Sequence, residues 1–178
     1  MVGRRLYACP YGKLMGSIME ELLTLCLAKG LKITAAESCT GGMVAAAMTD
    51  LAGSSAIFER GFVTYSNQAK VEMLGVSAET LDKFGAVSEQ VVLEMAQGAK
   101  NQAKADIAIA ISGIAGPGGS DHKPEGRVCF AICRQNENVA QTIEFTALGR
   151  PNVRAAARDH ALGLLLNAAI RTQPSQSA

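Results

Sequence analysis

Residues 106–112, which read DIAIAIS, decide the fold, because both alternating sets of side chains in this stretch are apolar. A strand with one face in water alternates apolar and polar residues, so this pattern is typical of a central strand that is covered on both sides. Such strands belong to sheets with parallel character, whose crossover helices lie on both faces. We therefore expect residues 106–112 to form the middle of the sheet in an α/β protein.

Two strand-turn-helix units precede this central strand. Residues 31–37 predict a strand, and the Ala-rich run up to about Leu51 predicts a helix that packs close against a sheet. Residues 57–65 are rich in β-branched and aromatic side chains and predict a second strand, followed by a short helix that Asn67 caps and Gly75 ends. Further helices are expected from Gly16 to Gly30, after Ser77 and after Ser88.

Downstream of the central strand, residues 127–134 and 139–146 predict an antiparallel hairpin, and Asn152 can cap a last helix. The predicted fold class is α/β: a single domain with a mixed, mostly parallel sheet, helices on both faces, and a C-terminal β-hairpin plus helix. The domain is expected to span residues 16–172. Residues 1–15 are expected to be an irregular extension, and residues 173–178 a polar tail.

The composition excludes several classes of protein. The chain contains seventeen Lys and Arg and sixteen Asp and Glu, so its net charge is +1. This charge disfavours a general nucleic-acid binder. Neither a membrane span nor a signal peptide is recognisable. We therefore expect a cytoplasmic protein that binds neither nucleic acid nor membranes. A homo-oligomer is compatible with a chain of this size and low charge.

The cysteines indicate a reducing compartment rather than a disulfide framework, because their number is odd. They are Cys9, Cys26, Cys39, Cys129 and Cys133. Cys129 and Cys133 would lie about 13 Å apart on one strand, which is too far for a disulfide. We expect both to be small core residues.

Three loops follow the predicted parallel strands and are expected to rim one pocket. They are residues 38–42, 65–70 and 112–119. In open α/β sheets, ligands bind at the carboxyl ends of the strands, where loops meet helix N-termini. If these strands are parallel, Ser38, Tyr65 and Lys70 come together despite their separation in sequence.

Ser38 is a candidate nucleophile, because it ends a strand just before a helix and is followed by N–H groups, from Cys39 to Gly42, that could stabilise an oxyanion. A plain helix-capping serine would have the same local sequence. Lys70 is the available base, since the helix N-terminus and burial would both lower its pKa, and Tyr65 could relay the proton or hold the amine. A solvated Lys70 and a structural Tyr65 are the alternatives.

Glycine loops and arginines could bind the rest of a substrate. The loop from Gly113 to Gly119 offers backbone N–H groups to a phosphate or carboxylate, but it matches neither common nucleotide-binding motif. Arg150 and Arg154 could add guanidinium donors. No cluster has the spacing of a zinc site, so no metal is expected.

Three motifs in this order resemble one family: residues 36–42 (AESCTGG), residues 61–67 (GFVTYSN) leading to Lys70, and residues 111–117 (ISGIAGP). The chain resembles the C-terminal domain family of the competence/damage-inducible protein CinA, from about residue 17 to 170. Members include stand-alone nicotinamide-nucleotide amidases. The resemblance implies hydrolysis of nicotinamide mononucleotide to nicotinic acid mononucleotide and ammonia, in pyridine nucleotide salvage, with no metal and no cofactor.

The resemblance also implies roles for individual residues. The family's catalytic serine, tyrosine and lysine fall on Ser38, Tyr65 and Lys70. Substrate binding falls on a larger set: Thr40, Gly41, Gly42, Ser112, Gly113, Ala115, Gly116, Arg150 and Arg154. The chain departs from the family at Glu125, where a small residue or valine is common, and at Gly149, where an acidic residue is common.

Two alternatives to this mechanism are compatible with the sequence. Cys39 could be the nucleophile in place of Ser38, because a thiol is intrinsically more nucleophilic than a hydroxyl. The chain could also be a non-catalytic nucleotide-binding or sensor module that uses the same pocket without turnover. Such a module would be stabilised by its ligand and would release no ammonia.

Overall fold

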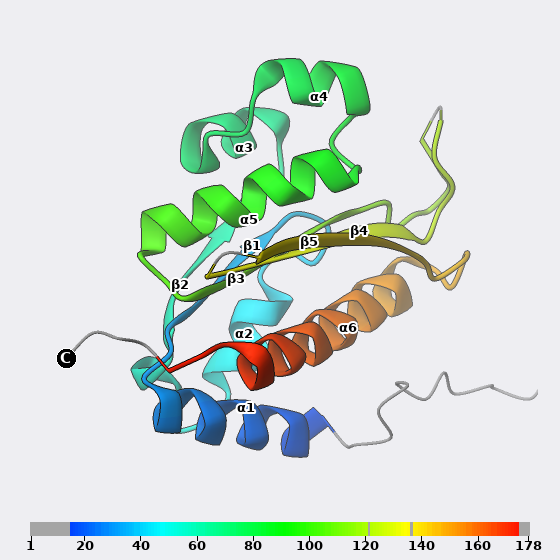
Figure 1. Cartoon of the computed structure of the whole chain (residues 1–178). Coiled ribbons are helices and arrows are strands. Elements are labelled where there is room, and N and C mark those ends of the chain that lie inside the picture. The colour runs from blue at the N-terminus through cyan, green and yellow to red at the C-terminus, as the bar shows by residue number, and fades with distance from the viewer. Residues whose placement is uncertain (1–14, 121, 136, 175–178) are drawn as a thin grey trace, which may run out of the picture.

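The computed structural model describes residues 15–120, 122–135 and 137–174, and these residues form a five-stranded sheet between two layers of helices (Figure 1). The strands are β1 (Ile33–Glu37), β2 (Phe58–Val63), β3 (Ile107–Gly113), β4 (Arg127–Arg134) and β5 (Glu137–Glu144). The helices are α1 (Met15–Lys29), α2 (Met43–Thr49), α3 (Asn67–Leu74), α4 (Ala78–Phe84), α5 (Glu89–Ala103) and α6 (Arg150–Arg171), with a short 3-10 turn at Ser54–Ala56.

The strand order is β2-β1-β3-β4-β5, so β3 lies in the middle, as the DIAIAIS stretch predicted. β1 pairs in parallel with both β2 and β3, whereas β3–β4 and β4–β5 are antiparallel. The mixed sheet and the C-terminal hairpin are therefore confirmed. The parallel side of the sheet is the one that carries the three predicted loops.

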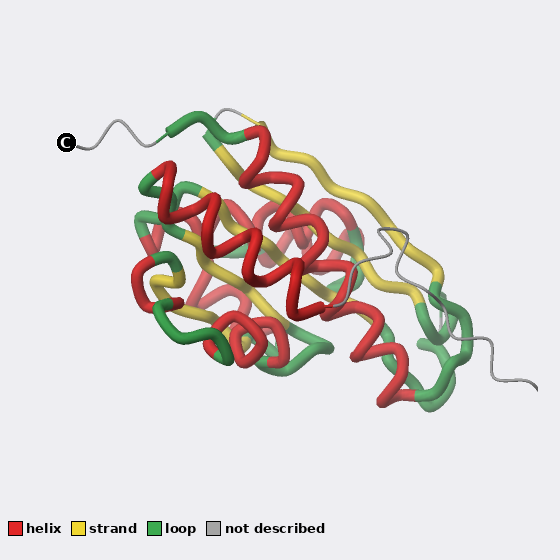
Figure 2. The backbone as a smooth tube through the Cα atoms, turned by 90° about the horizontal axis from the view of Figure 1, so that it is seen from below, coloured by secondary structure: helices red, strands yellow, loops and turns green. Residues whose placement is uncertain are grey.

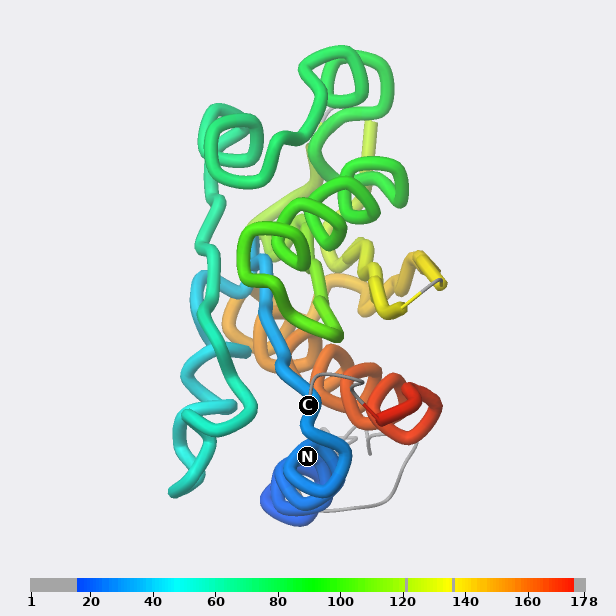
Figure 3. The backbone as a smooth tube through the Cα atoms, turned by 60° about the vertical axis from the view of Figure 1, so that its left-hand side comes forward, coloured from blue at the N-terminus to red at the C-terminus, as the bar shows by residue number. Residues whose placement is uncertain are grey.

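Helices cover both faces of the sheet, as predicted. In Figure 1, α3, α4 and α5 lie above the sheet, and α1, α2 and α6 lie below it. Seen from below in Figure 2, helices lie in front of the sheet and run roughly along its strands, and Figure 3 shows α1 and α6 packed beside each other.

The alternation within β3 explains the two layers. Ile107, Ile109 and Ile111 belong to the core that contains α1, α2 and α6 residues, whereas Ala108 and Ala110 belong to the core beneath α5. Small alanine side chains let a helix approach the sheet closely. All five residues are fully buried, which agrees with a strand covered on both sides.

Two helix starts differ from the sequence predictions. Ser66, not Asn67, caps α3, because its extended backbone lets the hydroxyl accept a hydrogen bond from Ala69 N at 3.0 Å. Gly149, not Asn152, precedes α6, whose first turn contains a proline that presets the helical backbone. β5 also begins two residues earlier than predicted.

The two predicted terminal segments overlap only slightly with the described residues. The predicted extension, including Cys9, lies outside them except for Met15, which begins α1. Residues 173 and 174 are the described part of the predicted tail. Cys129 and Cys133 are free and buried on β4, as expected. Among the described residues, no helix is long and apolar enough to cross a membrane.

Candidate active site

The three predicted loops meet at the carboxyl ends of β1, β2 and β3 and surround a cavity of about 210 Å³. The cavity is lined by eight of the residues singled out in the sequence: Ser38, Cys39, Tyr65, Lys70, Ser112, Gly113, Ala115 and Arg150. Thr40, Gly41, Gly42, Gly116 and Arg154 are not part of this lining. Parallel strand direction is what brings residues from 38 to 150 into one place.

Lys70 and Ser38 are in contact at the bottom of the cavity. The side chain of Lys70 is 1% exposed, and its Nζ atom lies 3.2 Å from Ser38 Oγ and donates to the carbonyl oxygen of Thr64 at 2.8 Å. The backbone of Thr64, rather than Tyr65, therefore holds the amine. Ser38 itself is buried and its N–H donates to Ile111 O at 2.9 Å, which ties it to the central strand.

Burial lowers the pKa of Lys70 below its usual 10.5, and the nearby Cys39 thiol opposes this shift. Among the described residues, no carboxylate forms an ion pair with Lys70. A buried amine without a countercharge favours its neutral form. Neutral Lys70 has a lone pair with which it can accept the proton of the Ser38 hydroxyl.

Glu37 fixes the turn that carries Ser38, and sequence reasoning missed this role. Its carboxylate is 1% exposed and accepts hydrogen bonds from Gly42 N, Val44 N and Ala45 N at 3.0, 3.1 and 2.8 Å. It thus neutralises the N-terminus of α2. The start of α2 is therefore occupied by the chain's own anion, and the signal in the sequence was an acidic residue just before a Gly-Gly helix start.

Two of the N–H groups expected to face a substrate are used elsewhere, which corrects part of the oxyanion prediction. Gly41 N donates to Ser38 O at 3.1 Å, and Gly42 N donates to Glu37. The N–H groups of Cys39 and Thr40 both approach the Cys39 sulfur and act to lower the pKa of the thiol. A thiol is a weak acceptor, and these two N–H groups, unlike those of Gly41 and Gly42, have no hydrogen bond to an oxygen within the described turn.

Cys39 lies in the cavity wall but is poorly suited to be a nucleophile. It is 5% exposed, and burial raises the pKa of its thiol to about 12. Because the thiolate is the reactive form, a thiol with this pKa is almost entirely unreactive near pH 7. The geometry favours the alternative with Ser38, whose hydroxyl contacts Lys70 directly.

Arg150 and Tyr65 meet at the mouth of the cavity. The guanidinium of Arg150 donates to Tyr65 Oη at 2.7 Å and to Gly116 O at 2.9 Å, which joins α6, the β2–α3 loop and the glycine loop. Both side chains are exposed, and Tyr65 is 60% exposed. Arg150 is thus a cationic group at the rim, whereas Lys70 lies at the bottom.

Arg154, by contrast, supports the turn from behind. Its Nε donates to Cys39 O and its Nη2 to Thr40 O, both at 3.0 Å. Gly41 has a left-handed backbone, with φ of +59°, and a Cβ there would lie 3.3 Å from Arg154 Nη2. The guanidinium is therefore hydrogen-bonded to the backbone carbonyls of two consecutive residues in the turn that follows Ser38.

The connection between α4 and α5 forms a further wall that the sequence did not predict. Ala86 and Val87 of this connection line the cavity, as does Asn67, which belongs to the predicted 65–70 loop. Ser112 Oγ donates to Ala86 O at 2.7 Å, and Lys123 Nζ donates to Phe84 O and Val87 O at 2.7 Å. In all three hydrogen bonds the acceptor is a backbone carbonyl oxygen. Every residue has one, so the sequence of this connection did not predict these contacts.

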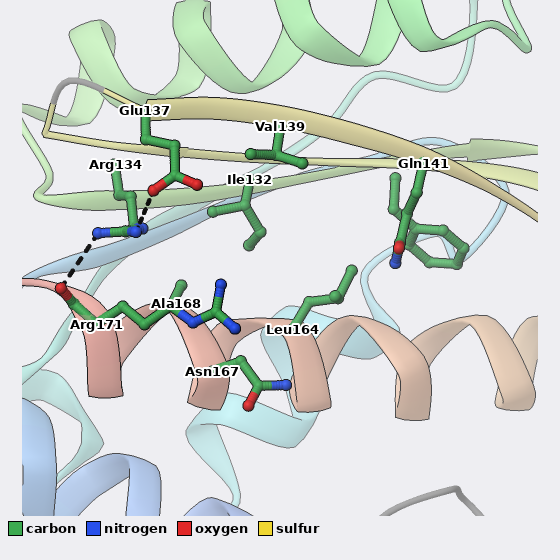
Figure 4. Close-up of a pocket in the computed structure, with 10 residues that line it drawn as sticks. Ile132, Arg134, Glu137, Val139, Gln141, Leu164, Asn167, Ala168 and Arg171 are labelled. Atoms are coloured by element: carbon green, nitrogen blue, oxygen red, sulfur yellow. Dashed lines mark hydrogen bonds and ion pairs between the residues drawn. The ribbon is translucent and has the colours of Figure 1, made fainter.

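A second cavity, of about 470 Å³, lies between β4, β5 and the C-terminal half of α6 (Figure 4). Apolar side chains line it from both sides, with Ile132 and Val139 on the strands and Leu164 on α6, and an ion pair between Arg134 and Glu137 lies at one end. None of the predicted site residues lines it. Of these two cavities, the smaller one therefore holds the candidate nucleophile and the candidate base.

Neither histidine supplies a base at Ser38. His160 lies in α6, with its ring 4.7 Å from that of Phe130, and burial lowers the pKa of its imidazole. His122 is exposed in the loop after β3 and does not line the cavity. Within the described ranges, no group of three or more His, Cys, Asp or Glu side chains could hold a metal ion.

The chain matches known proteins over nearly its whole length. Residues 15–169 match the family model described as CinA C-terminal domain. Nicotinamide-nucleotide amidohydrolase PncC from Escherichia coli (strain K12) is 55% identical over 149 residues, which cover 83% of this chain and 90% of the relative. The CinA-like protein of Fervidobacterium nodosum is 48% identical over 76% of this chain, which corresponds to 32% of that longer relative.

Solved structures agree with the sequence matches. The competence damage-inducible protein A (ComA) from Klebsiella pneumoniae superposes with a TM-score of 0.86 and 40% identity, covering 90% of this chain and 100% of the other. The competence/damage inducible protein CihA from Agrobacterium tumefaciens superposes with a TM-score of 0.82 and 45% identity, covering 86% of this chain and 95% of the other.

Proposed function

Because the chain belongs to the CinA C-terminal domain family, we propose that it hydrolyses the carboxamide of nicotinamide mononucleotide, giving nicotinic acid mononucleotide and ammonia. The observation that carries this proposal is the contact between a buried lysine and a serine at the carboxyl ends of parallel strands. The choice of substrate is supported by the name of a relative that is 55% identical, a nicotinamide-nucleotide amidohydrolase.

In the first half of the reaction, Ser38 Oγ attacks the carboxamide carbon while neutral Lys70 takes the hydroxyl proton. The C–N bond then breaks, and the Lys70 ammonium returns that proton to the departing ammonia. Ser38 is left esterified to the acyl group of the nucleotide. The Thr64 carbonyl holds the amine in place throughout, because it accepts one of its hydrogens.

In the second half, water attacks the ester carbon and Lys70 takes a proton from that water. The Ser38 oxygen leaves with this proton, and nicotinic acid mononucleotide is released. In both halves a negative charge develops on the carbonyl oxygen, and we assign the N–H groups of Cys39 and Thr40 to stabilise it, because those of Gly41 and Gly42 are already used within the turn.

The phosphate of the substrate is assigned to the mouth of the cavity. A volume of about 210 Å³ suits the nicotinamide end of the nucleotide and leaves the phosphate outside. Arg150 is the exposed guanidinium at this rim. Arg154 already holds Cys39 O and Thr40 O, so it is assigned to the Ser38 turn and not to the phosphate. Tyr65 is expected to orient Arg150 toward the substrate.

Release of ammonia from nicotinamide mononucleotide by the native chain, measured in the presence of a chelator, tests the proposal. We expect multiple turnovers and stoichiometric nicotinic acid mononucleotide. A non-catalytic sensor module would instead be stabilised against thermal unfolding by the nucleotide without releasing ammonia. That second outcome would overturn the hydrolytic function, but the cavity would still be assigned as a nucleotide-binding site.

Cys39→Ala is expected to keep turnover within about tenfold of the native rate, because a thiol with a pKa of about 12 contributes no thiolate. Iodoacetamide should likewise leave the initial rate of the native chain unchanged, since Cys39 is 5% exposed. Ammonia release is the measurement in both cases. Complete loss of activity in both experiments would restore Cys39 as the nucleophile.

A further inference from the structure

We propose that Glu125 is a positioning residue that holds the glycine loop and, through Gly116, holds Arg150 at the mouth of the cavity. This inference rests on the proposed function and extends it, because it identifies what keeps the phosphate-binding group in place. Glu125 precedes β4 and lies outside the cavity lining. Its effect on the substrate is therefore assigned to the glycine loop and Arg150, which it contacts or supports, and not to a direct contact inside the cavity.

The carboxylate of Glu125 lies directly against the glycine loop. Its Oε2 accepts a hydrogen bond from Gly118 N at 2.6 Å. A Cβ added to Gly116 would lie 2.3 Å from Glu125 Cδ, so the carboxylate fills the space that a side chain at position 116 would need. The backbone of Gly116 is also left-handed, with φ of +87°. Both features require glycine at this position.

The same glycine is the anchor of Arg150. Gly116 O accepts a hydrogen bond from Arg150 Nη1 at 2.9 Å, and Arg150 Nη2 donates to Tyr65 Oη at 2.7 Å. Contacts thus run from Glu125 through Gly116 to Arg150 and on to Tyr65. Glycine-rich backbone is flexible unless other groups fix it. The Glu125 carboxylate is a group that fixes it in this loop.

This placement also decides which part of the loop can bind an anion. Gly118 N is the donor that Glu125 uses, and a carboxylate against Gly116 would repel a phosphate at the same place. Residues 116–118 are therefore a support for Arg150 and not a cradle for the phosphate. We therefore assign Gly116 to holding the Arg150 guanidinium through its carbonyl oxygen, in place of the expected contact with substrate.

The experiment compares Glu125→Ala with Glu125→Gln, because glutamine keeps an acceptor oxygen for Gly118 N but carries no charge. We expect Glu125→Ala to raise KM for nicotinamide mononucleotide about tenfold with little change in kcat, and Glu125→Gln to stay within about threefold of native. Glu79→Ala, an exposed acid in the first turn of α4, is the control. Nicotinamide riboside, which lacks the phosphate, should show no effect of Glu125→Ala on its KM.

A double-mutant cycle with Arg150→Ala separates positioning from an independent role. If Glu125 acts through Arg150, Glu125→Ala adds nothing to the KM of the Arg150→Ala chain. Fully additive effects would overturn the proposal. So would a lower KM in Glu125→Gln, because it would mean that the carboxylate repels a phosphate bound on the loop.

Amide hydrogen exchange in the absence of substrate gives a readout that does not depend on the proposed function. The amides of residues 116–118 should exchange faster in Glu125→Ala and near the native rate in Glu125→Gln. Native exchange in both variants would overturn the positioning role even if the chain hydrolyses the nucleotide. If the native chain releases no ammonia, the exchange experiment still decides whether Glu125 orders the loop.

Discussion

Ser38→Ala is expected to lower kcat for ammonia release about 10⁴-fold or more, because it removes the atom that forms the bond to the carboxamide carbon. The fold should persist. Ser38 Oγ contacts Lys70 Nζ, which keeps its hydrogen bond to Thr64 O in the variant. The variant should also bind nicotinamide mononucleotide with near-native affinity by calorimetry, since the rim residues are unchanged.

Ser112→Ala is the matched control, because Ser112 is a second buried serine in the same cavity. Its hydroxyl donates to Ala86 O at 2.7 Å, so it supports a wall of the cavity, whereas the described serine contact of Lys70 is with Ser38. We expect a loss of about tenfold or less from this change. Ammonia release by Ser38→Ala at a rate similar to that of Ser112→Ala would refute Ser38 as the nucleophile.

The acyl-enzyme offers direct evidence for the same assignment. Acid quenching during turnover should trap an ester between Ser38 and the nucleotide acyl group, and mass spectrometry of the peptide that contains residues 36–42 would locate it. The ester should be absent from Ser38→Ala. A modified Cys39 in place of Ser38 would assign the chemistry to the thiol.

The part of the fold that the sequence predicted follows from hydrophobic pattern. The DIAIAIS stretch predicted a central strand because apolar side chains on both alternations are costly unless both faces are covered, and both are. Strand direction then predicted that residues 38, 65 and 70 would converge. These inferences depend on hydrophobic periodicity and on the order of strands and helices, both of which can be read from one amino-acid sequence.

The hydrogen bonds that hold the site residues in place could not be predicted in the same way, because most of them involve backbone groups. Thr64 holds Lys70 through a backbone carbonyl, which every residue type possesses. Glu37 and Glu125 both bind backbone N–H groups of glycine-containing turns, and only the folded chain shows that the turns lie within reach. The two arginines near residue 150 look equivalent in sequence, yet one turn of helix separates a guanidinium at the rim from one behind the Ser38 turn.

Lys70→Met is expected to abolish ammonia release and at the same time to stabilise the fold. The loss of the base should cost about 10³-fold or more in kcat, since general-base catalysis and activation of Ser38 both disappear. Methionine has a similar length and fills the buried space without an amine to desolvate. Replacing buried polar or charged groups with apolar ones of similar size is often stabilising, so we expect Tm to rise by about 2 to 6 °C.

The pH dependence of stability separates this explanation from simple repacking. Burial lowers the pKa of Lys70 in the folded chain below 10.5, whereas the unfolded chain keeps the ordinary value. Between the two values the unfolded chain binds a proton that the folded chain does not, so the free energy of unfolding rises with pH. The contribution is lost as pH falls through this window. Lys70→Met should lack this rise, which denaturant titrations across the window would measure.

Lys70→Arg tests the cost of burying a charge at this position, because arginine keeps a positive charge that it cannot lose in a protein. It should be as inactive as Lys70→Met but less stable than the native chain, since a permanently charged group would then occupy a position that is 1% exposed. In the native chain, ammonia release should increase with pH as Lys70 loses its proton. Equal stability of the methionine and arginine variants would show that the buried amine carries no desolvation cost, and burial would then no longer explain a neutral base at Ser38.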